Sequence, residues 1–319
     1  MLRSSPTDAV ATGSTRAPDR IFRWLMAGVA LLVVGLLLAV AVQLILGSAP
    51  AFNQFGAGFI SGQTWDPSKA IFGSLPFIAG TIATSLLAML LAVPIGILTA
   101  VFLSEMAPRW LAIPLTFTVD LIAAIPSVIV GLWGLGVLSV FLRDEFETPI
   151  TDGFGGLPFV GADATGSDLL AASLVLALMV TPTIVAITRE VFATVPQANR
   201  EAMLGLGATR WETIRRVVLP AARSGIIGAS ILALGRAMGE TMAVTMTIGN
   251  ADRVPSGLFE PAQTIASKIA TSWNEASQAA EQQALIGLGL VLMVLSVAMV
   301  FATRVLLRGR FVGRRAPAA

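Results

Sequence analysis

Two ionisable residues interrupt an apolar stretch in the last third of the chain. Arg236 lies about a dozen residues into the apolar run Ser224–Ile248, and Glu240 follows one helical turn later on the same predicted face. A charge at the centre of a bilayer costs on the order of 3 kcal/mol, so such residues normally face a protein interior or a water-filled path. A guanidinium offers a planar donor fork to a passing oxyanion, and Glu240 could hold it and balance its charge. The pair is therefore a candidate anion site within a membrane.

A third ionisable residue, Asp120, lies in another apolar run, Leu111–Leu142. It is a candidate for the same pathway. The alternative is purely structural: Arg236 would pair with Glu240 or with Asp120 and help to pack a helix bundle.

The residue types that are absent exclude several kinds of chemistry. The chain has no Cys, His or Tyr, so it has no disulfide, no thiolate or imidazole metal ligand and no His-dependent catalysis. A phosphate-binding P-loop requires Gly-Lys-Ser/Thr, but Lys69 and Lys268 are followed by Ala70 and Ile269. We therefore expect no metal site, no cofactor and no enzymatic activity in this chain, and an intramembrane enzyme is excluded on the same grounds.

A polar segment between two apolar runs, residues 195–225, carries the most specific pattern in the chain. It divides around Gly205-Leu206-Gly207, and Thr209 with Glu212 has the spacing of a capping box, so a second helix is predicted to begin at Arg210 and to end at Pro220. Such a helix–turn–helix could lie on anionic lipid headgroups or could dock a soluble partner.

These features must be positioned by membrane-spanning helices. The composition is 55% hydrophobic and 13% charged, about half the charge of a soluble domain. Six apolar runs are long enough to cross a bilayer. The third contains Pro114 and Pro126 and is predicted to be tilted or bent. The six runs are Trp24–Leu46, Phe77–Leu103, Leu111–Leu142, Leu169–Thr188, Ser224–Ile248 and Ala284–Leu307.

The basic residues fix the orientation of these spans. With the N-terminus inside, the inner flanks hold 16 of the 21 Lys and Arg residues, so both termini are predicted to be cytoplasmic. The expected fold is an all-α integral membrane protein, and nucleic acid is not expected as a partner. We expect a flexible cytoplasmic tail over residues 1–19, one transmembrane domain over 20–312 and a short tail over 313–319.

Two motifs resemble those of a known family. In residues 195–225, Glu201-Ala202, then Gly207, then Val217-x-Leu219-Pro220 resembles the EAA motif of ABC-importer permeases, with Val217 where Ile is common and Met203 in place of the second Ala. The stretch GRAMGETMAV, residues 235–244, resembles the signature of the phosphate permeases of the PstC type, as do AAIPSVIVGLWG and GTIATSLLAMLLAVPIGI. The resemblance extends from Gly73 to Leu307.

The resemblance implies the architecture of an ABC type I importer permease in the bacterial inner membrane. It implies that residues 195–225 form coupling helices that insert into an ATPase subunit, with contacts from Glu201, Ala202, Gly207, Trp211, Leu219 and Pro220. The implied partners are a PstA-type second permease, two ATP-binding subunits that use ATP and Mg²⁺, and a phosphate-binding protein. Inorganic phosphate would be the substrate. In that family the Arg and Glu at the positions of Arg236 and Glu240 are regarded as essential.

Other functions stay open on the residues alone. The permease could carry a different oxyanion, such as molybdate, sulfate or a phosphonate. Alternatively, Arg236, Glu240 and Asp120 could form the ion relay of an ATP-independent channel or carrier, but that function would leave the EAA-like segment unexplained.

Overall fold

The structure, a computed structural model, describes residues 16–154 and 164–312. The predicted tails therefore lie largely outside the described residues, although helix already begins at Arg16, four residues before the predicted domain boundary. The chain forms two compact units, residues 1–47 and residues 48–319.

The prediction of six spans is confirmed. Six helices among the described residues are long and apolar enough to cross a membrane: Asp19–Phe55, Leu75–Met106, Ser127–Gly153, Leu169–Ala193, Arg210–Gly239 and Ala279–Val305. The first belongs to α1 (Arg16–Phe55), and most of α1 forms the N-terminal unit. Its most apolar window has a mean hydropathy of 3.0, which is typical of a helix that can lie in lipid.

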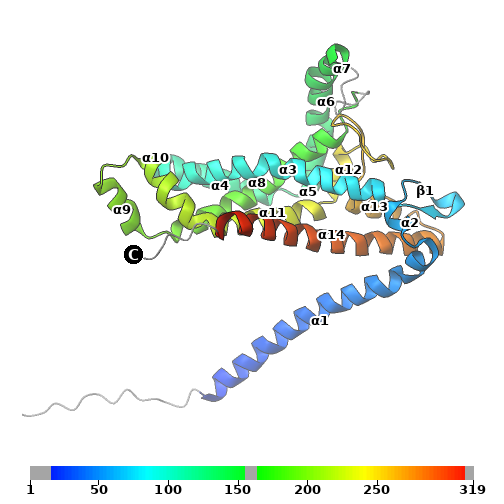
Figure 1. The fold of residues 1–319 in the computed structure, drawn as a ribbon, viewed down its shortest axis with the longest axis horizontal. Coiled ribbons are helices and arrows are strands. Elements are labelled where there is room, and N and C mark those ends of the chain that lie inside the picture. The colour runs from blue at the N-terminus through cyan, green and yellow to red at the C-terminus, as the bar shows by residue number, and fades with distance from the viewer. Residues whose placement is uncertain (1–15, 155–163, 313–319) are drawn as a thin grey trace, which may run out of the picture. The chain divides into compact units, whose positions relative to one another are not determined.

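The second unit is built around three packed helices, α3 (Leu75–Val101), α8 (Leu169–Ala193) and α11 (Leu219–Gly239). Small residues allow their backbones to approach closely. A Cβ on Gly96 of α3 would lie 2.8 Å from Ile184 Cγ2 of α8, so no larger residue fits there without a shift. The last helix, α14 (Ala279–Val312), lies alongside α11 (Figure 1).

The third predicted span, Leu111–Leu142, is divided by a break at Pro126, and its bounds are wrong: the helix that can cross the membrane is Ser127–Gly153, and a separate helix precedes it. Helix α4 spans Arg109–Ala124. It ends at Ala124 because the next two residues, Ile125 and Pro126, have extended backbone conformations. The chain resumes as α5 (Ser127–Trp133) and continues to Phe154, with α6 and α7 standing away from the bundle (Figure 1). Pro114 lies inside α4 without ending it. The later elements are η3 (Gly134–Leu138), α6 (Ser139–Leu142), η4 (Arg143–Glu147) and α7 (Thr148–Phe154).

An aromatic cluster closes the outer end of the second unit. Phe59, Trp65, Phe72 and Phe77 are buried there, with edge-to-face ring contacts at centroid distances of 4.9 and 5.4 Å from Trp65 to Phe72 and to Phe77. The cluster is formed by short elements next to α3: α2 (Gly58–Ser61), an antiparallel pair of strands β1 (Trp65–Asp66) and β2 (Ile71–Phe72) joined by the 3-10 turn η1 (Pro67–Lys69), and α13 (Ile265–Ser272).

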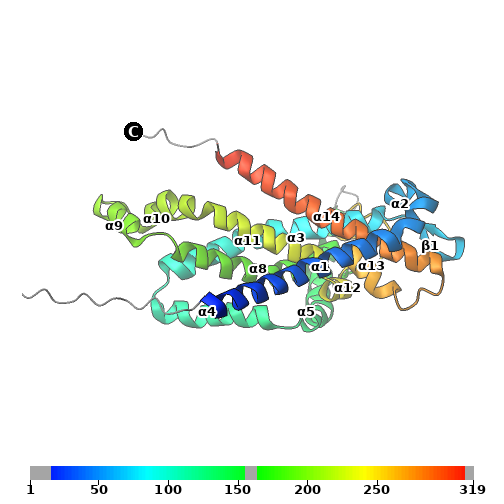
Figure 2. The ribbon, with the colours of Figure 1, turned by 90° about the horizontal axis from the view of Figure 1, so that it is seen from below.

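The opposite, inner end carries the polar segment that the sequence singled out. It contains α9 (Gln197–Gly205), α10 (Arg210–Thr213) and the π-helical turn η5 (Ile214–Val218), near the end of α3 and the beginning of α4 (Figure 1, Figure 2). The prediction that Pro220 ends the second helix is wrong. Helix continues from Arg210 to Gly239, because the wider η5 turn places Pro220 in the first turn of α11, where a missing N–H costs little.

Candidate functional site

Arg236 lies on an open face of α11. Its guanidinium is exposed in the isolated chain, and Nη1 donates one long hydrogen bond, 3.4 Å, to Thr183 Oγ1 of α8. It forms no ion pair with any described residue. On the same face, a Cβ at Gly228, Gly235 or Gly239 would meet no atom within 4 Å, and Leu232 is 61% exposed. The adjoining face is buried at Ala229, Ala233 and Ala237, so Arg236 lies at the edge of the packed side of the helix.

Glu240 does not lie one turn beyond Arg236 on a continuous helix, so that part of the prediction is wrong. Helix α11 ends at Gly239, Glu240 is extended (φ −67°, ψ 127°), and α12 (Met242–Thr247) begins after Thr241. The Glu240 carboxylate points to the start of α12, where Oε1 is 3.5 Å from the Ala243 amide nitrogen. Gly239 favours the break because glycine is a poor helix former, and the carboxylate supplies an acceptor to an amide that the break leaves free.

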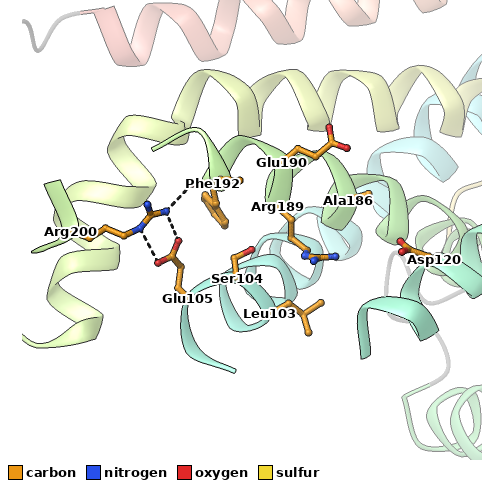
Figure 3. Close-up of a pocket in the computed structure, with 10 residues that line it drawn as sticks. Leu103, Ser104, Glu105, Asp120, Ala186, Arg189, Glu190, Phe192 and Arg200 are labelled. Atoms are coloured by element: carbon orange, nitrogen blue, oxygen red, sulfur yellow. Dashed lines mark hydrogen bonds and ion pairs between the residues drawn. The ribbon is translucent and has the colours of Figure 1, made fainter. Parts of the chain in front are cut away.

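Asp120 lies in another part of the second unit. It is exposed on α4 and lines a cavity of about 570 Å³ near the inner end (Figure 3). Arg189 of α8 also lines this cavity, and its Nε is buried without a hydrogen-bond partner among the described residues. Neither Arg236 nor Glu240 lines it. The structure therefore does not place the three predicted pathway residues together.

The polar segment forms the predicted helix–turn–helix. Gly207 has φ +86°, a left-handed conformation that favours glycine, and it joins α9 to the residues before α10. The predicted capping box is confirmed: Glu212 N donates to Thr209 Oγ1 at 3.3 Å, and Thr209 N donates to Glu212 Oε2 at 2.9 Å. The turn therefore has a defined conformation.

The surface around this turn is unusually apolar for a polar segment. Leu204, Leu206 and Trp211 are 46%, 83% and 50% exposed, and Glu201 and Ala202 are exposed beside them. We call Leu204, Leu206 and Trp211 the turn patch. Leu219 and Pro220, which the motif also includes, lie instead in the first turn of α11, with Leu219 half-buried and Pro220 exposed.

An ion pair that the sequence did not single out attaches this segment to the bundle. Arg200 of α9 donates through Nη2 to Glu105 Oε1 at 2.8 Å and through Nε to Glu105 Oε2 at 3.2 Å (Figure 3). Its guanidinium also donates to the carbonyl oxygens of Phe192 and Val195. Both charged side chains are largely buried, at 15% and 12% exposure. The available signal was Glu105, an acid at the end of an apolar run.

The outer end holds a second feature that the sequence did not reveal, a pair of fully buried acids. Asp168 caps α8 by accepting from Ala171 N at 2.8 Å, and Glu147 of η4 accepts from Gly166 N at 2.7 Å. The remaining oxygens, Asp168 Oδ2 and Glu147 Oε1, have no partner among the described residues. Burial, followed by the nearby Glu147 carboxylate, raises the pKa of Asp168 to about 8. A proton held between the two carboxyl groups accounts for this arrangement.

The described residues contain no group of three or more acidic, His or Cys side chains that could hold a metal ion. The inner end and the open face of α11 are both suited to binding. The inner end presents an apolar patch, and the open face presents a guanidinium that forms no ion pair within the described part of the chain.

Comparison with known proteins agrees with this arrangement. Residues 92–312 match the family model described as "Binding-protein-dependent transport system inner membrane component". The chain is 44% identical to the phosphate transport system permease protein PstC of Mesorhizobium japonicum over 310 residues, covering 96% of this chain and 91% of that protein. It is 40% identical to PstC of Haemophilus influenzae over 293 residues, covering 91% and 93%, respectively.

Solved structures share the fold at low sequence identity. A bacterial ABC transporter involved in the import of the acidic polysaccharide alginate has a TM-score of 0.61 and 19% identity, covering 92% of this chain and 98% of the other. The MetNI methionine ABC transporter in an inward-facing conformation has a TM-score of 0.53 and 19% identity, covering 73% and 94%. The fold is that of ABC type I importer permeases. On the family model and the relatives together, this chain belongs to the binding-protein-dependent transport system inner membrane components, among the PstC phosphate transport permeases.

Proposed function

We propose that this chain is the permease subunit of an ATP-driven importer of inorganic phosphate. As a member of its family it is a multi-pass transport subunit of the bacterial inner membrane, and it is not itself an enzyme. Phosphate is the substrate that the names of its relatives give. The observation that carries the proposal is the exposed Arg236, in the last turn of α11 within an apolar run, with no ion pair to any described residue.

The environment of Arg236 supports a role in the pathway. A guanidinium that faced lipid at this depth would cost on the order of 3 kcal/mol, so the open face of α11 must be covered by another protein chain or by water. The three glycines on that face leave room next to the guanidinium. In this proposal a second permease of the PstA type lies opposite, and phosphate passes between the two chains, in contact with Arg236.

Glu240 and Asp120 have different roles in this proposal. Glu240 lies at the break between α11 and α12, and discontinuous helices at mid-bilayer are typical of substrate sites in transporters. It would keep the break in place and limit how strongly Arg236 retains the anion. Asp120 would act later on the pathway, at the inner cavity that it shares with Arg189.

The turn patch is the proposed contact with the ATPase. Leu204, Leu206 and Trp211 expose apolar surface at the inner end, where two ATP-binding subunits would supply hydrolysis with ATP and Mg²⁺. Glu201 and Ala202 lie beside the patch, and Leu219 and Pro220 extend the same helix into the membrane. A phosphate-binding protein would deliver the substrate at the outer end.

The test is phosphate uptake by cells that carry Arg236→Gln. We expect uptake to be lost while membrane insertion and subunit assembly persist, because the variant removes the charge and keeps a polar side chain. Arg304→Gln is the matched control, since Arg304 is also exposed on a membrane helix but lies near the inner end of α14. Normal uptake by Arg236→Gln would overturn the role of Arg236. Competition by molybdate or sulfate stronger than by phosphate would instead favour another oxyanion as the substrate.

A further inference from the structure

A second cavity, of about 730 Å³, lies at the inner end on the other side of the Arg200–Glu105 ion pair (Figure 3 shows the pair). We call it the inner groove. Its walls come from the end of α3, the beginning of α4, and the segment from α9 to η5. Three arginines line it, Arg109, Arg200 and Arg210, together with one acid, Glu105.

The charges in the inner groove are not balanced. Arg200 is neutralised by Glu105 and uses four of its five N–H donors on that carboxylate and two backbone carbonyl groups. Arg109 and Arg210 form no ion pair or side-chain hydrogen bond with any residue that the structure describes. Glu212, the nearest acid along the chain to Arg210, is turned back to Thr209 in the capping box and does not line the groove. Two guanidinium groups therefore face one groove without counter-ions.

The position of these two arginines indicates what could neutralise them. Arg109 is followed directly by Trp110, which is 75% exposed and lies outside the turn patch, whereas Trp211, after Arg210, belongs to that patch. Tryptophan next to a basic residue is typical of the boundary between the membrane and the cytoplasm, where anionic lipid headgroups gather. Beyond Arg109, α4 presents Ile113 and Phe117, which are 70% and 68% exposed, as a surface for acyl chains.

We propose that the inner groove binds a phosphate group between Arg109 and Arg210. Guanidinium forks match phosphate oxygens in geometry and charge, and basic pockets between membrane helices on the cytoplasmic side are known to hold lipid headgroups. In the membrane, the phosphodiester of an anionic phospholipid is the phosphate group available to this groove. Free cytoplasmic phosphate would present the same anionic oxygens to the two arginines. The bound group joins the first turn of α4 to the first turn of α10. This inference does not depend on phosphate being the transported substrate.

The test is to purify the whole importer in mild detergent and to count the anionic phospholipids that it retains, by native mass spectrometry. We compare the wild type with the double variant Arg109→Gln/Arg210→Gln. We expect the wild type to retain one more anionic lipid per copy of this chain than the double variant retains. The matched control is Arg215→Gln/Arg216→Gln, which removes the same charge from exposed positions of η5 that do not line the groove; we expect it to behave as the wild type.

A second arm separates the two sources of phosphate. The wild-type importer is exposed to excess inorganic phosphate, and binding of radiolabelled phosphate is measured in parallel. Lipid retention that is insensitive to inorganic phosphate assigns the groove to a headgroup, whereas labelled phosphate that binds to the wild type and not to the double variant assigns it to free phosphate. Should the double variant fail to assemble, Arg109→Gln alone serves, since Arg109 lies outside the segment from α9 to α10. Equal lipid retention and equal phosphate binding in all variants would overturn the proposal.

Discussion

Arg200 and Arg236 are the same residue type in opposite environments. Arg200 donates to two carboxylate oxygens and two carbonyl oxygens and is 15% exposed, so four of its five N–H donors are already used within the chain. Arg236 makes one long hydrogen bond and is exposed. The first arginine holds a segment in place, and the second is available to a transported anion. Only the structure separates these roles, because both are simply basic residues in the sequence.

The buried acids Asp168 and Glu147 predict a dependence on pH. The pKa of Asp168 is raised to about 8 in the folded chain, from about 4 when unfolded, so the folded state holds a proton that the unfolded state has lost. This stabilisation is complete below about pH 4 and is lost as the pH rises through about 8. We expect the midpoint temperature of thermal unfolding of the purified importer to decrease as the pH is raised from about 6 to about 9.

Asp168→Asn should remove this dependence, because the amide carries its own donor and does not titrate. Asp66→Asn is the control, since hydrogen bonds from Ser68 and Lys69 lower the pKa of Asp66 to about 2 and it stays ionised throughout that range. A wild-type midpoint that is constant from about pH 6 to about pH 9, or one that changes equally in Asp168→Asn, would contradict a shared proton.

At the scale of elements, the turn between α9 and α10 is the part that most needs a fixed shape. Gly207 has φ +86° and open space around its missing Cβ, so a side chain there meets no steric obstacle but forces a strained backbone, at a cost of about 1 kcal/mol or more. We expect Gly207→Val to shift the turn patch, so that ATP hydrolysis persists but is no longer coupled to phosphate uptake.

Gly205→Val is the matched control for this prediction. Gly205 lies two residues earlier, ends α9, also has open space at its Cβ and has no positive φ. Uptake and ATPase activity are measured together in proteoliposomes. Tight coupling in Gly207→Val, or an equal loss in Gly205→Val, would show that the conformation at residue 207 does not matter.

Much of the element structure could be predicted from the sequence, because apolar runs of bilayer length have few alternatives. The bend at Pro126 and the capping box at Thr209 were also predictable, since each rests on local chemistry. What failed was the continuity of helices. Pro220 does not end a helix, because the π-helical turn η5 precedes it and the helix continues through it into α11. Gly239 does end a helix, although it lies within a continuous apolar run of the sequence. Both outcomes depend on hydrogen bonds that residue types do not reveal.

The candidate site was predictable in part, for the same physical reason. An arginine in an apolar run is visible in the sequence, so Arg236 could be identified. The separation of Asp120 from Arg236 could not be predicted, because it depends on how their helices pack. Arg200–Glu105 joins residues 95 positions apart, and Asp168–Glu147 brings the N-cap of α8 next to η4, so neither pair has a local signature.

At the scale of the whole molecule, the chain is a multi-pass permease of the bacterial inner membrane. The second unit contains both the open face of α11 and the turn patch. The central claim is that this open face borders an aqueous path for phosphate and does not contact lipid.

The chain contains no cysteine, so a single introduced thiol reports on one position. Leu232→Cys places it on the face of Arg236, and Leu90→Cys, at a residue 70% exposed on α3, is the comparison for a lipid-facing position. The measurement is the rate at which a membrane-impermeant thiol reagent labels each variant in the assembled importer. We predict that Leu232→Cys is labelled rapidly and that phosphate changes the rate, whereas Leu90→Cys is not labelled. If Leu232→Cys proved as unreactive as Leu90→Cys, with and without ATP, the path would not run along this face.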